Sequence, residues 1–175
     1  MNVVIKLASV DDAKTLARLG RETSQAYFSQ VWGPGKLADF IERDFAEAVL
    51  RTQLGNPDRH AYTLLELDNQ PVGFARINWK RPVPLSDAAG AELQKIYLLP
   101  GFTGKGLGTR LLVDAIERVR ARPDPLVWLD VLTNNPRARK LYERHGFTVT
   151  GKLPFKTDLI EIDRHVMVRR DAPAT

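Results

Sequence analysis

A glycine-rich turn that leads from a strand into a helix is the stretch of this sequence best suited to chemistry. Gly104, Gly106 and Gly108 lie between an apolar strand predicted over residues 92–99 and the helix that follows. Glycines leave backbone N–H groups uncovered, and the N-terminus of a helix carries a partial positive charge. We therefore expect the turn to hold a phosphate group through its backbone.

Two common phosphate-binding motifs do not fit this turn. A Walker A loop needs Lys followed by Ser or Thr, whereas Lys105 is followed by Gly106. The dinucleotide-binding fingerprint is GxGxxG, whereas residues 104–108 read GxGxG and lie in the second half of the chain. The sequence therefore favours neither a magnesium–nucleotide site nor a dinucleotide site.

Asp130 is a second candidate for chemistry because it interrupts the apolar segment Leu126–Leu132. A carboxylate in such a strand is costly unless it is paired or functional. It could anchor a cationic amine or assist its deprotonation, or it could form a buried pair with Arg or Lys. The histidines, His60, His145 and His165, show no metal-ligand spacing, and the chain has no cysteine, so no metal site is expected.

These residues must be positioned by a domain in which strands and helices are mixed. The sequence predicts strands over residues 3–7, 62–67, 71–79, 92–99, 126–132, 147–153 and 160–168. It predicts helices from about 11 toward a break at 30–35, then to about 54, over 107–121 and over 136–146, with a loop over 81–90. Asn135 followed by Pro136 is expected to cap the last helix, and Gly146 to end it in a left-handed conformation.

The composition is that of an ordinary globular domain, with 175 residues, 43% hydrophobic and 27% charged. The length predicts a single domain over residues 1–169 and a frayed polar tail over 170–175. No apolar segment reaches the roughly 20 residues that span a bilayer, and the apolar N-terminal stretch is too short for a secretory signal. We expect a cytoplasmic protein with no membrane partner.

The net charge of +5 raises the alternative of a nucleic-acid-binding protein. However, the 26 basic residues are dispersed among 21 acidic ones. The densest basic run, residues 118–122, lies at a helix end, where cations are favourable. No nucleic-acid partner is therefore expected.

Two sequence blocks together resemble the GNAT superfamily of acetyl-coenzyme A-dependent N-acetyltransferases. Thr103–Gly108 follows the family pattern (Arg/Gln)-x-x-Gly-x-(Gly/Ala), and Asn135–Phe147 follows Asn-x-x-Ala-x-x-hydrophobic-Tyr-x-x-x-Gly-Phe. The resemblance covers residues 92–168 closely, and the preceding half in the order of its elements. It implies an α/β fold, with a central twisted mixed sheet of about six or seven strands flanked by about four helices.

The resemblance also implies acetyl-CoA as co-substrate, with no metal. The residues expected to bind it are Ile96, Tyr97, Leu98, Thr103, Gly104, Lys105, Gly106, Leu107, Gly108, Thr109, Asn135 and Ala138. Thr103 departs from the family, which usually has Arg or Gln there. Lys105 or Arg110 could supply the missing charge.

Aminolysis of an acetyl thioester needs a neutral amine, a polarised carbonyl and a proton for the departing thiolate. By resemblance, Tyr142, on the same helix face as Ala138, protonates the thiolate, and the N–H of Leu98 polarises the carbonyl. Glu92 is the candidate general base, and strict strand alternation predicts that it shares a face with Ile96 and Leu98.

Each of these assignments has a structural alternative. Tyr142 could be an aromatic residue that only packs against the strand beneath it. Glu92 could be a solvated acid at a strand end, and Asn135 could serve as a helix cap alone. Asp130 completes the set of candidate catalytic residues, with the two roles given above.

Within the family, the sequence is most similar to the bacterial polyamine (spermidine/spermine) branch, through segments 92–97, 106–108, 145–151 and 157–160. The helix before the hairpin carries acids that could face a cationic substrate or only solvent: Asp39, Glu42, Asp44 and Glu47. Part of the branch's acidic stretch is replaced by residues 154–157.

The predicted activity is direct transfer of an acetyl group from acetyl-CoA to the primary amine of a small molecule, with a polyamine as one option. A homodimer is one assembly to consider. The alternatives are a peptide or protein N-acetyltransferase of the same fold, and a non-catalytic acyl-CoA-binding regulatory module.

Overall fold

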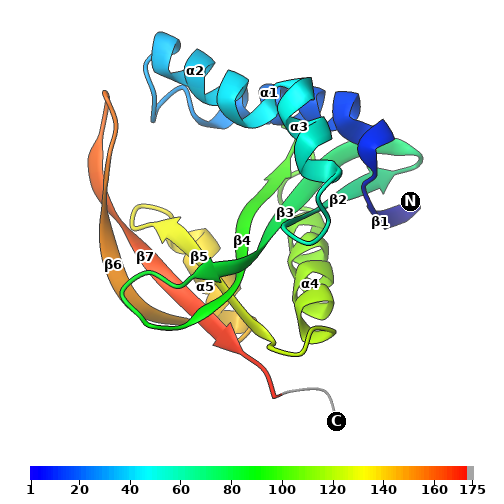
Figure 1. The fold of residues 1–175 in the computed structure, drawn as a ribbon. Coiled ribbons are helices and arrows are strands. Elements are labelled where there is room, and N and C mark those ends of the chain that lie inside the picture. The colour runs from blue at the N-terminus through cyan, green and yellow to red at the C-terminus, as the bar shows by residue number, and fades with distance from the viewer. Residues whose placement is uncertain (173–175) are drawn as a thin grey trace.

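A mixed sheet of seven strands lies at the centre of the protein in this computed structural model, which describes residues 1–172 (Figure 1). The strands are β1 (Val3–Leu7), β2 (His60–Leu67), β3 (Gln70–Pro82), β4 (Ala89–Leu98), β5 (Leu126–Leu132), β6 (Thr148–Lys156) and β7 (Glu161–Arg170). Their order is β1-β2-β3-β4-β5-β7-β6, and each neighbouring pair is antiparallel except β4 with β5. The α/β fold and mixed sheet expected from the sequence are confirmed.

The helices cover both faces of this sheet. They are α1 (Ala13–Tyr27), preceded by a 3-10 turn (Val10–Asp12), α2 (Pro34–Phe45), α3 (Glu47–Leu54), α4 (Leu107–Arg120) and α5 (Pro136–Arg144). Figure 1 shows α1, α2 and α3 grouped together, with α4 on the other side of β3 and β4. One apolar cluster joins α4 and α5 to the sheet, and a second joins α1 and α3 to the opposite face.

The apolar stripe of α4 fixes where this helix begins. Its buried residues are Leu107, Leu111, Leu112, Ala115, Ile116 and Val119. Burying one Leu side chain stabilises the fold by about 1.5–3 kcal/mol. Since the stripe starts at the first residue of the helix, packing holds the N-terminus of α4 directly beside the glycine turn.

The single helix expected up to residue 54 is wrong, because the chain breaks at Ala46 into α2 and α3. Ala46 is extended, with φ −59° and ψ 137°. Phe45 is 1% exposed, and its ring fills the space that a Cβ on Gly20 of α1 would need. Leu50 is also buried. Residues five apart in a continuous helix point about 140° away from each other, so the break lets both side chains face the core.

The β3–β4 hairpin is longer than predicted, and the loop expected over 81–90 is partly strand. Arg81 pairs with Gly90, and Pro82 pairs with Ala89. The turn beyond them is held because Val83 is buried in a third apolar cluster beside β5. Tertiary packing therefore extends a hairpin that its two prolines would otherwise shorten.

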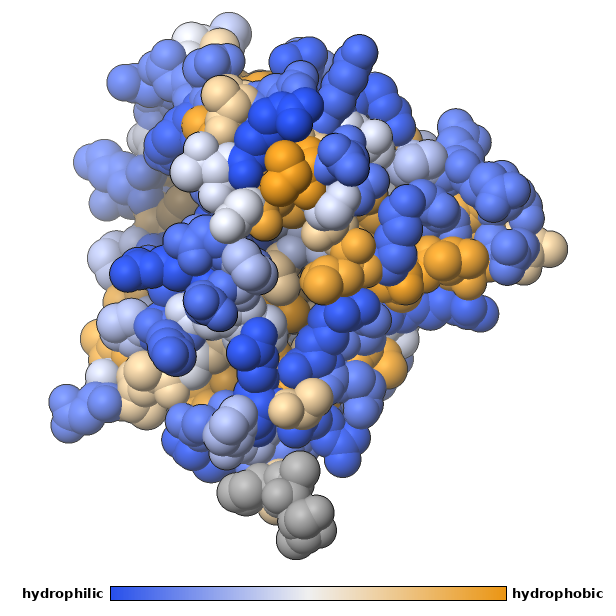
Figure 2. Space-filling view, turned by 45° about the vertical axis from the view of Figure 1, so that its right-hand side comes forward, coloured by the Kyte–Doolittle hydropathy of each residue, from blue (hydrophilic) through white to orange (hydrophobic). Residues whose placement is uncertain are grey.

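Pairing in β7 continues through Arg170, two residues beyond the predicted strand. Residues 173–175 of the expected tail lie outside the described residues, and the single-domain boundary at 169 stays a prediction. None of the helices described is long and apolar enough to cross a membrane. Figure 2 shows a mostly hydrophilic surface with one elongated hydrophobic strip toward its right side, and a homodimer also stays a prediction.

Candidate functional site

The sheet opens at its centre because β4 and β5 separate soon after they meet. Their register pairs are Ala91 with Val127 and Glu92 with Trp128. The last residue of β4, Leu98, lies six residues beyond Glu92. The part of β4 that follows Glu92 therefore presents one edge of its backbone to this opening between the strands.

The backbone N–H of Leu98 is directed into the opening. On the other edge of β4, the N–H of Leu99 donates to the carbonyl of Val72 at 2.8 Å. Backbone N–H groups of successive strand residues point to opposite edges. The N–H of Leu98 therefore points away from β3 and is placed to donate to a ligand oxygen.

A β-bulge interrupts β4 beside this opening. Arg76 of β3 pairs with Lys95, and Ile77 pairs with Leu93. Gln94 is thus an extra residue without a register partner, which is the defining feature of a bulge. Beyond the bulge, each side chain of β4 therefore lies on the face opposite to the one that strict alternation from Glu92 predicts.

The predicted placement of Glu92 is wrong for this reason. Ile96 and Leu98 belong to the apolar cluster under α4. Glu92 lies on the opposite face, where its Oε2 accepts a hydrogen bond from Asn78 Nδ2 at 2.9 Å. Strict alternation cannot hold across an inserted residue, so Glu92 shares no face with Ile96 or Leu98.

The glycine turn presents uncapped N–H groups, as the sequence predicts. Gly104 and Gly106 have φ of +77° and +76°, a region that glycine tolerates best. Gly106 is the N-cap of the 14-residue helix α4, and no side chain of the described residues caps it. The N–H groups of Leu107, Gly108 and Thr109 have no acceptors within the helix and can bind an anion.

Arg137 of α5 lies against the glycine turn, and sequence reasoning missed it. Its Nη2 is 3.7 Å from the position that a Cβ on Gly104 would take. Thr103 and Lys105 are both exposed, whereas Arg110 lines a hollow beside β1. Arg137 is therefore better placed than Arg110 to supply the charge that Thr103 lacks. The only sequence signal was its position two residues after the Asn cap.

Helix α5 has the two ends that the sequence predicts. Asn135 Oδ1 accepts a hydrogen bond from the Ala138 N–H at 3.1 Å, and Gly146 has φ +82°. Ala138 and Tyr142 both pack against the cluster under α4, so they share one helix face. The Tyr142 ring lies edge-on to Phe147, with 5.9 Å between the ring centroids.

The Tyr142 hydroxyl remains protonated across the physiological range. Burial, and to a lesser extent the charge of Asp130, raise its pKa to about 12. The hydroxyl hydrogen-bonds to none of residues 1–172 and is not sealed from solvent. It is therefore a neutral O–H that can donate to a ligand in the opening.

The Tyr142 shift predicts a loss of stability in alkali. The folded protein keeps this proton up to about pH 12, whereas an unfolded tyrosine loses it near pH 10. Between these values the folded state binds more protons, so the free energy of unfolding falls as pH rises. Urea titrations at pH 10 and pH 12 should show that the free energy of unfolding of wild type falls about 2 kcal/mol more than that of Tyr142→Phe. Equal losses in the two proteins would contradict the buried neutral hydroxyl.

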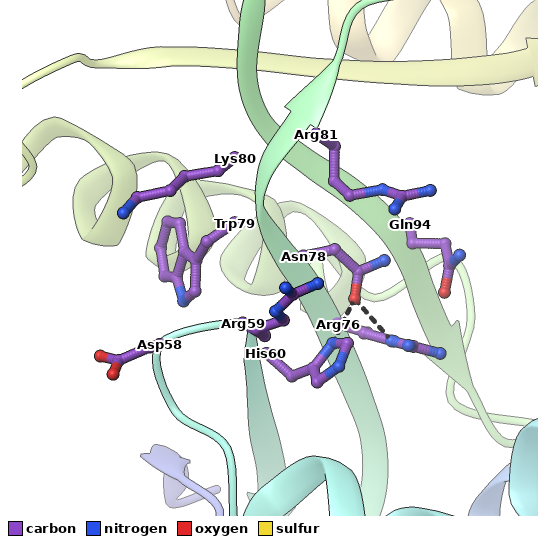
Figure 3. A pocket seen from close by; sticks show the side chains of 9 residues that line it. All are labelled: Asp58, Arg59, His60, Arg76, Asn78, Trp79, Lys80, Arg81 and Gln94. Atoms are coloured by element: carbon purple, nitrogen blue, oxygen red, sulfur yellow. Dashed lines mark hydrogen bonds between the residues drawn. The ribbon is translucent and has the colours of Figure 1, made fainter.

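A polar network on the face opposite α4 orients Glu92. Asn78 Oδ1 accepts from Arg76 Nε at 2.9 Å and lies 2.9 Å from His60 Nδ1, as the dashed lines in Figure 3 mark. Its Nδ2 then donates to Glu92, and Arg81 Nε lies 3.6 Å from the same carboxylate. Burial lowers the pKa of His60, so the ring is neutral at pH 7. Together these contacts fix the direction of the Asn78 amide.

Asp130 forms an ion pair with an arginine, but at an exposed position and not in the buried pair that was one of its two predicted roles. Its Oδ2 lies 3.2 Å from Arg164 Nη1, and the Asp130 side chain is 31% exposed. Burial raises its pKa, although the charge of Arg164 opposes that shift. The pairing accounts for an acid in this strand without requiring a catalytic role.

A buried ion pair that sequence reasoning missed lies on the same face as Glu92. Lys95 Nζ is 2.8 Å from Asp44 Oδ2, and the Lys95 side chain is 5% exposed. The rings of Phe40 and Phe45 lie 5.5 and 5.4 Å from the ammonium. Burial lowers the pKa of Lys95, while attraction to Lys95 lowers that of Asp44 despite burial. This pair ties α2 to β4.

The segment between α1 and α2 is fastened to the β6–β7 hairpin. The Thr157 hydroxyl donates to the Val31 carbonyl. The Asp158 carboxylate accepts from the N–H of Gly33, at 3.1 and 3.2 Å. These contacts join parts of the chain more than 120 residues apart, on either side of the sheet opening.

The structure gathers some of the predicted residues and disperses others. Glu92 is close enough to Asp130 for its charge to raise the pKa of Asp130. The charge of Asp130 in turn raises the pKa of Tyr142. Tyr97, by contrast, packs its ring into the cluster with α1. Within residues 1–172, no group of three His, Cys, Asp or Glu side chains could hold a metal ion.

Comparison with known proteins places these features in a family. The model of the acetyltransferase (GNAT) family matches residues 20–147. An uncharacterised N-acetyltransferase of Mycobacterium tuberculosis is 28% identical over 158 residues, which are 90% of this chain and 97% of that protein.

Two solved structures show the same fold. The PaiA N-acetyltransferase of Thermoplasma acidophilum, in complex with coenzyme A, has a TM-score of 0.74 at 20% identity, over 98% of this chain and 100% of that one. A spermidine N-acetyltransferase chimera of Vibrio cholerae and hSSAT has a TM-score of 0.70 at 19% identity, over 97% of this chain and 96% of that one.

Proposed function

We propose, from the premise that this chain belongs to the acetyltransferase (GNAT) family, that it acetylates the primary amine of a small molecule. The chain is an N-acetyltransferase that uses acetyl-CoA as its acetyl donor. The observation that carries the proposal is the opening between β4 and β5, with the glycine turn at the start of α4 beyond the end of β4. Tyr142 of α5 packs against the same apolar cluster as Ile96 and Leu98 of β4.

The residues around the opening suit a coenzyme A thioester. The uncapped N–H groups at the start of α4 and the guanidinium of Arg137 would hold the pyrophosphate. The free edge of β4 at Ile96 and Leu98 would pair with the amide groups of the pantetheine arm. Asn135 uses its Oδ1 as a helix cap, which leaves its Nδ2 for the same arm.

The chemistry follows from three groups of this chain. Glu92 accepts the proton of the attacking amine, directly or through water. The N–H of Leu98 stabilises the negative charge on the carbonyl oxygen as the C–N bond forms. Tyr142 donates its proton to the sulfur as the C–S bond breaks. The acetyl group passes directly to the amine, without a covalent enzyme intermediate.

A small acceptor fits better than a peptide. The contacts of Thr157 with Val31 and of Asp158 with Gly33 join the segment before α2 to the β6–β7 hairpin. We infer that this connection restricts access to the opening from that end. An extended peptide would need that end to be free. A peptide or protein N-acetyltransferase therefore remains the alternative that requires these contacts to open.

Two of the acidic residues that favoured a polyamine acceptor form ion pairs within the protein. Asp44 is paired with Lys95, and Glu47 Oε1 lies 2.8 Å from Arg51 Nη2. These contacts reduce the negative charge available to a polycation. A polyamine acceptor stays a prediction, as does a cytoplasmic location.

The proposal is tested by steady-state kinetics with acetyl-CoA and a panel of polyamines, amino acids, aminoglycosides and peptides. We expect CoA release with at least one small amine and little with peptides. Turnover with peptides alone would favour the alternative. Binding of CoA without turnover on any amine would identify a non-catalytic acyl-CoA-binding module.

The glycine turn gives a direct prediction for donor binding. Gly106 has a positive φ although the space around it is open, so Gly106→Ala adds backbone strain of about 1–2 kcal/mol without a clash. If relief of that strain tilts the N–H groups of α4, CoA should bind about tenfold more weakly. Gly35→Ala is the matched control, since Gly35 also has open space but no positive φ. Equal CoA affinities by calorimetry in the two variants would exclude the turn as the binding element.

A further inference from the structure

A cationic pocket lies beside the β4 bulge, next to Glu92 (Figure 3). Its volume is about 450 Å³. Four of its lining residues are cationic, and one is acidic: Arg59, Arg76, Lys80, Arg81 and Asp58. In Figure 3 Asp58 points away from the cluster formed by Arg59, Arg76 and Arg81. The pocket therefore carries an excess of positive charge.

Arg76 is the unusual member of this group because it is buried without a carboxylate. It is 7% exposed, and its Nε donates to Asn78 Oδ1. Its guanidinium lies over the Tyr62 ring, 5.4 Å from the ring centroid. The terminal nitrogens make no hydrogen bond or ion pair within residues 1–172. These nitrogens are not among the sealed polar atoms that lack a partner, and Arg76 lines the pocket. An anion in the pocket would therefore complete the hydrogen bonds of this guanidinium.

Two residues that line the pocket, Asn78 and Arg81, connect it to the candidate base. Asn78 accepts from Arg76 and donates to Glu92, with both distances 2.9 Å. Arg81 contacts the pocket and lies 3.6 Å from the Glu92 carboxylate. An acceptor whose anionic group rests on Arg76 would therefore have its amine close to Glu92.

We propose that this pocket binds an anionic group of the acetyl acceptor, so that the substrate is a primary amine that also carries a carboxylate or phosphoryl group. The proposal rests on the function proposed above and makes the acceptor more specific. A guanidinium matches either group with two parallel hydrogen bonds. The guanidinium groups of Arg59, Arg76 and Arg81 would repel a polycation such as spermidine.

Matched amine pairs test the proposal in steady-state kinetics with acetyl-CoA. Glycine is compared with glycinamide, and O-phosphoethanolamine with ethanolamine, with spermidine as the polycation. We expect the anionic member of at least one pair to have a kcat/KM about tenfold or more above its neutral partner. The pair with the larger ratio identifies the carboxylate or the phosphoryl group as the one recognised. Ratios near one in both pairs, or a preference for spermidine, would overturn the proposal and leave the acetyltransferase function intact.

Variants locate the effect in the pocket. Arg76→Gln should bring the ratio of kcat/KM within the preferred pair close to one, mainly through a higher KM for the anionic amine. Because Arg76 is buried and its loss could impair folding, Arg59→Gln provides a second variant at an exposed position and should lower the ratio several-fold. Arg21→Gln removes a positive charge from the exposed face of α1, outside the pocket, and should leave the ratio unchanged. An equal fall of the ratio in Arg21→Gln would mean a general field effect and would overturn the proposal.

A binding measurement keeps the proposal separate from the proposed function. Inorganic phosphate is titrated into the full chain by calorimetry with CoA present at saturation, so that the glycine turn is already filled. Binding that is lost in Arg76→Gln or Arg59→Gln supports the anion pocket even if none of the amines is acetylated. An absence of phosphate binding in the wild type would overturn the anion pocket, whereas an absence of turnover with every amine of the larger panel would overturn the proposed function.

Discussion

Tyr142→Phe is expected to lower kcat about 100- to 1,000-fold and to change the KM for acetyl-CoA less than about twofold. The substitution removes one hydroxyl and leaves the ring that packs against Phe147 and the α4 cluster. In the proposed donor site, binding depends on backbone groups and on Arg137, which the change does not touch. The hydroxyl matters when the C–S bond breaks, because a thiolate then needs a proton.

The measurement is steady-state CoA release with the best amine from the panel, at saturating acetyl-CoA and over a range of pH. Tyr27→Phe is the matched control, because Tyr27 is 42% exposed at the end of α1, and it should retain the wild-type kcat. A pre-steady-state comparison shows whether chemistry is rate-limiting in the variant. An unchanged kcat with chemistry still rate-limiting would leave Tyr142 as an aromatic that only packs.

The parts of the site that local sequence rules govern were predicted well. The start of α4 at Leu107 followed from its apolar period, and the ends of α5 followed from Asn135 and Gly146. These features depend on backbone conformation and on neighbours within four residues. The two blocks that carry the family resemblance are of this local kind, so the fold and the donor site could be inferred together.

The parts that long-range packing governs could not be predicted. The bulge at Gln94 depends on how β4 aligns with β3, and it reverses the face on which Glu92 lies. The break at Ala46 depends on Phe45 meeting Gly20, which is 25 residues earlier. In the sequence, Arg76 is one of many dispersed basic residues. That it has no carboxylate partner within residues 1–172 becomes visible only when its neighbours in space are known.

The reversal of Glu92 changes what its neighbourhood implies about the acceptor. On the expected face it would have lain in the apolar cluster under α4. On the observed face it meets Asn78 and Arg81, and it shares the surface with the pocket of Arg76. Glu92 and the cationic pocket thus lie on one side of the sheet, and α4 with the glycine turn lies on the other. Such a division suits a reaction in which the donor and acceptor approach from opposite faces of the sheet.

Glu92→Gln is expected to lower kcat/KM for the amine about 100-fold or more near neutral pH. A glutamine has the same shape, and its side-chain oxygen can still accept the hydrogen bond from Asn78, so the fold around β4 should persist. What is lost is the ability to take a proton from the amine. At neutral pH most of an alkylamine is protonated, since its pKa is near 10.

The division of the deficit between kcat and KM, measured across the pH range, distinguishes a base from a charge that merely attracts the substrate. If Glu92 takes the proton, the deficit of the variant should shrink as pH rises toward 10, because more of the amine is then already neutral. If Glu92 only attracts the ammonium form of the substrate, the deficit should appear in KM. It should shrink only as that ammonium is deprotonated, and kcat should be unaffected at every pH. Glu117→Gln, on the exposed side of α4, is the matched control and should follow the wild-type profile.

Asp130→Asn should lower kcat less than Glu92→Gln does, because Asp130 is already paired with Arg164. A larger loss of kcat in Asp130→Asn than in Glu92→Gln would transfer the role of base to Asp130.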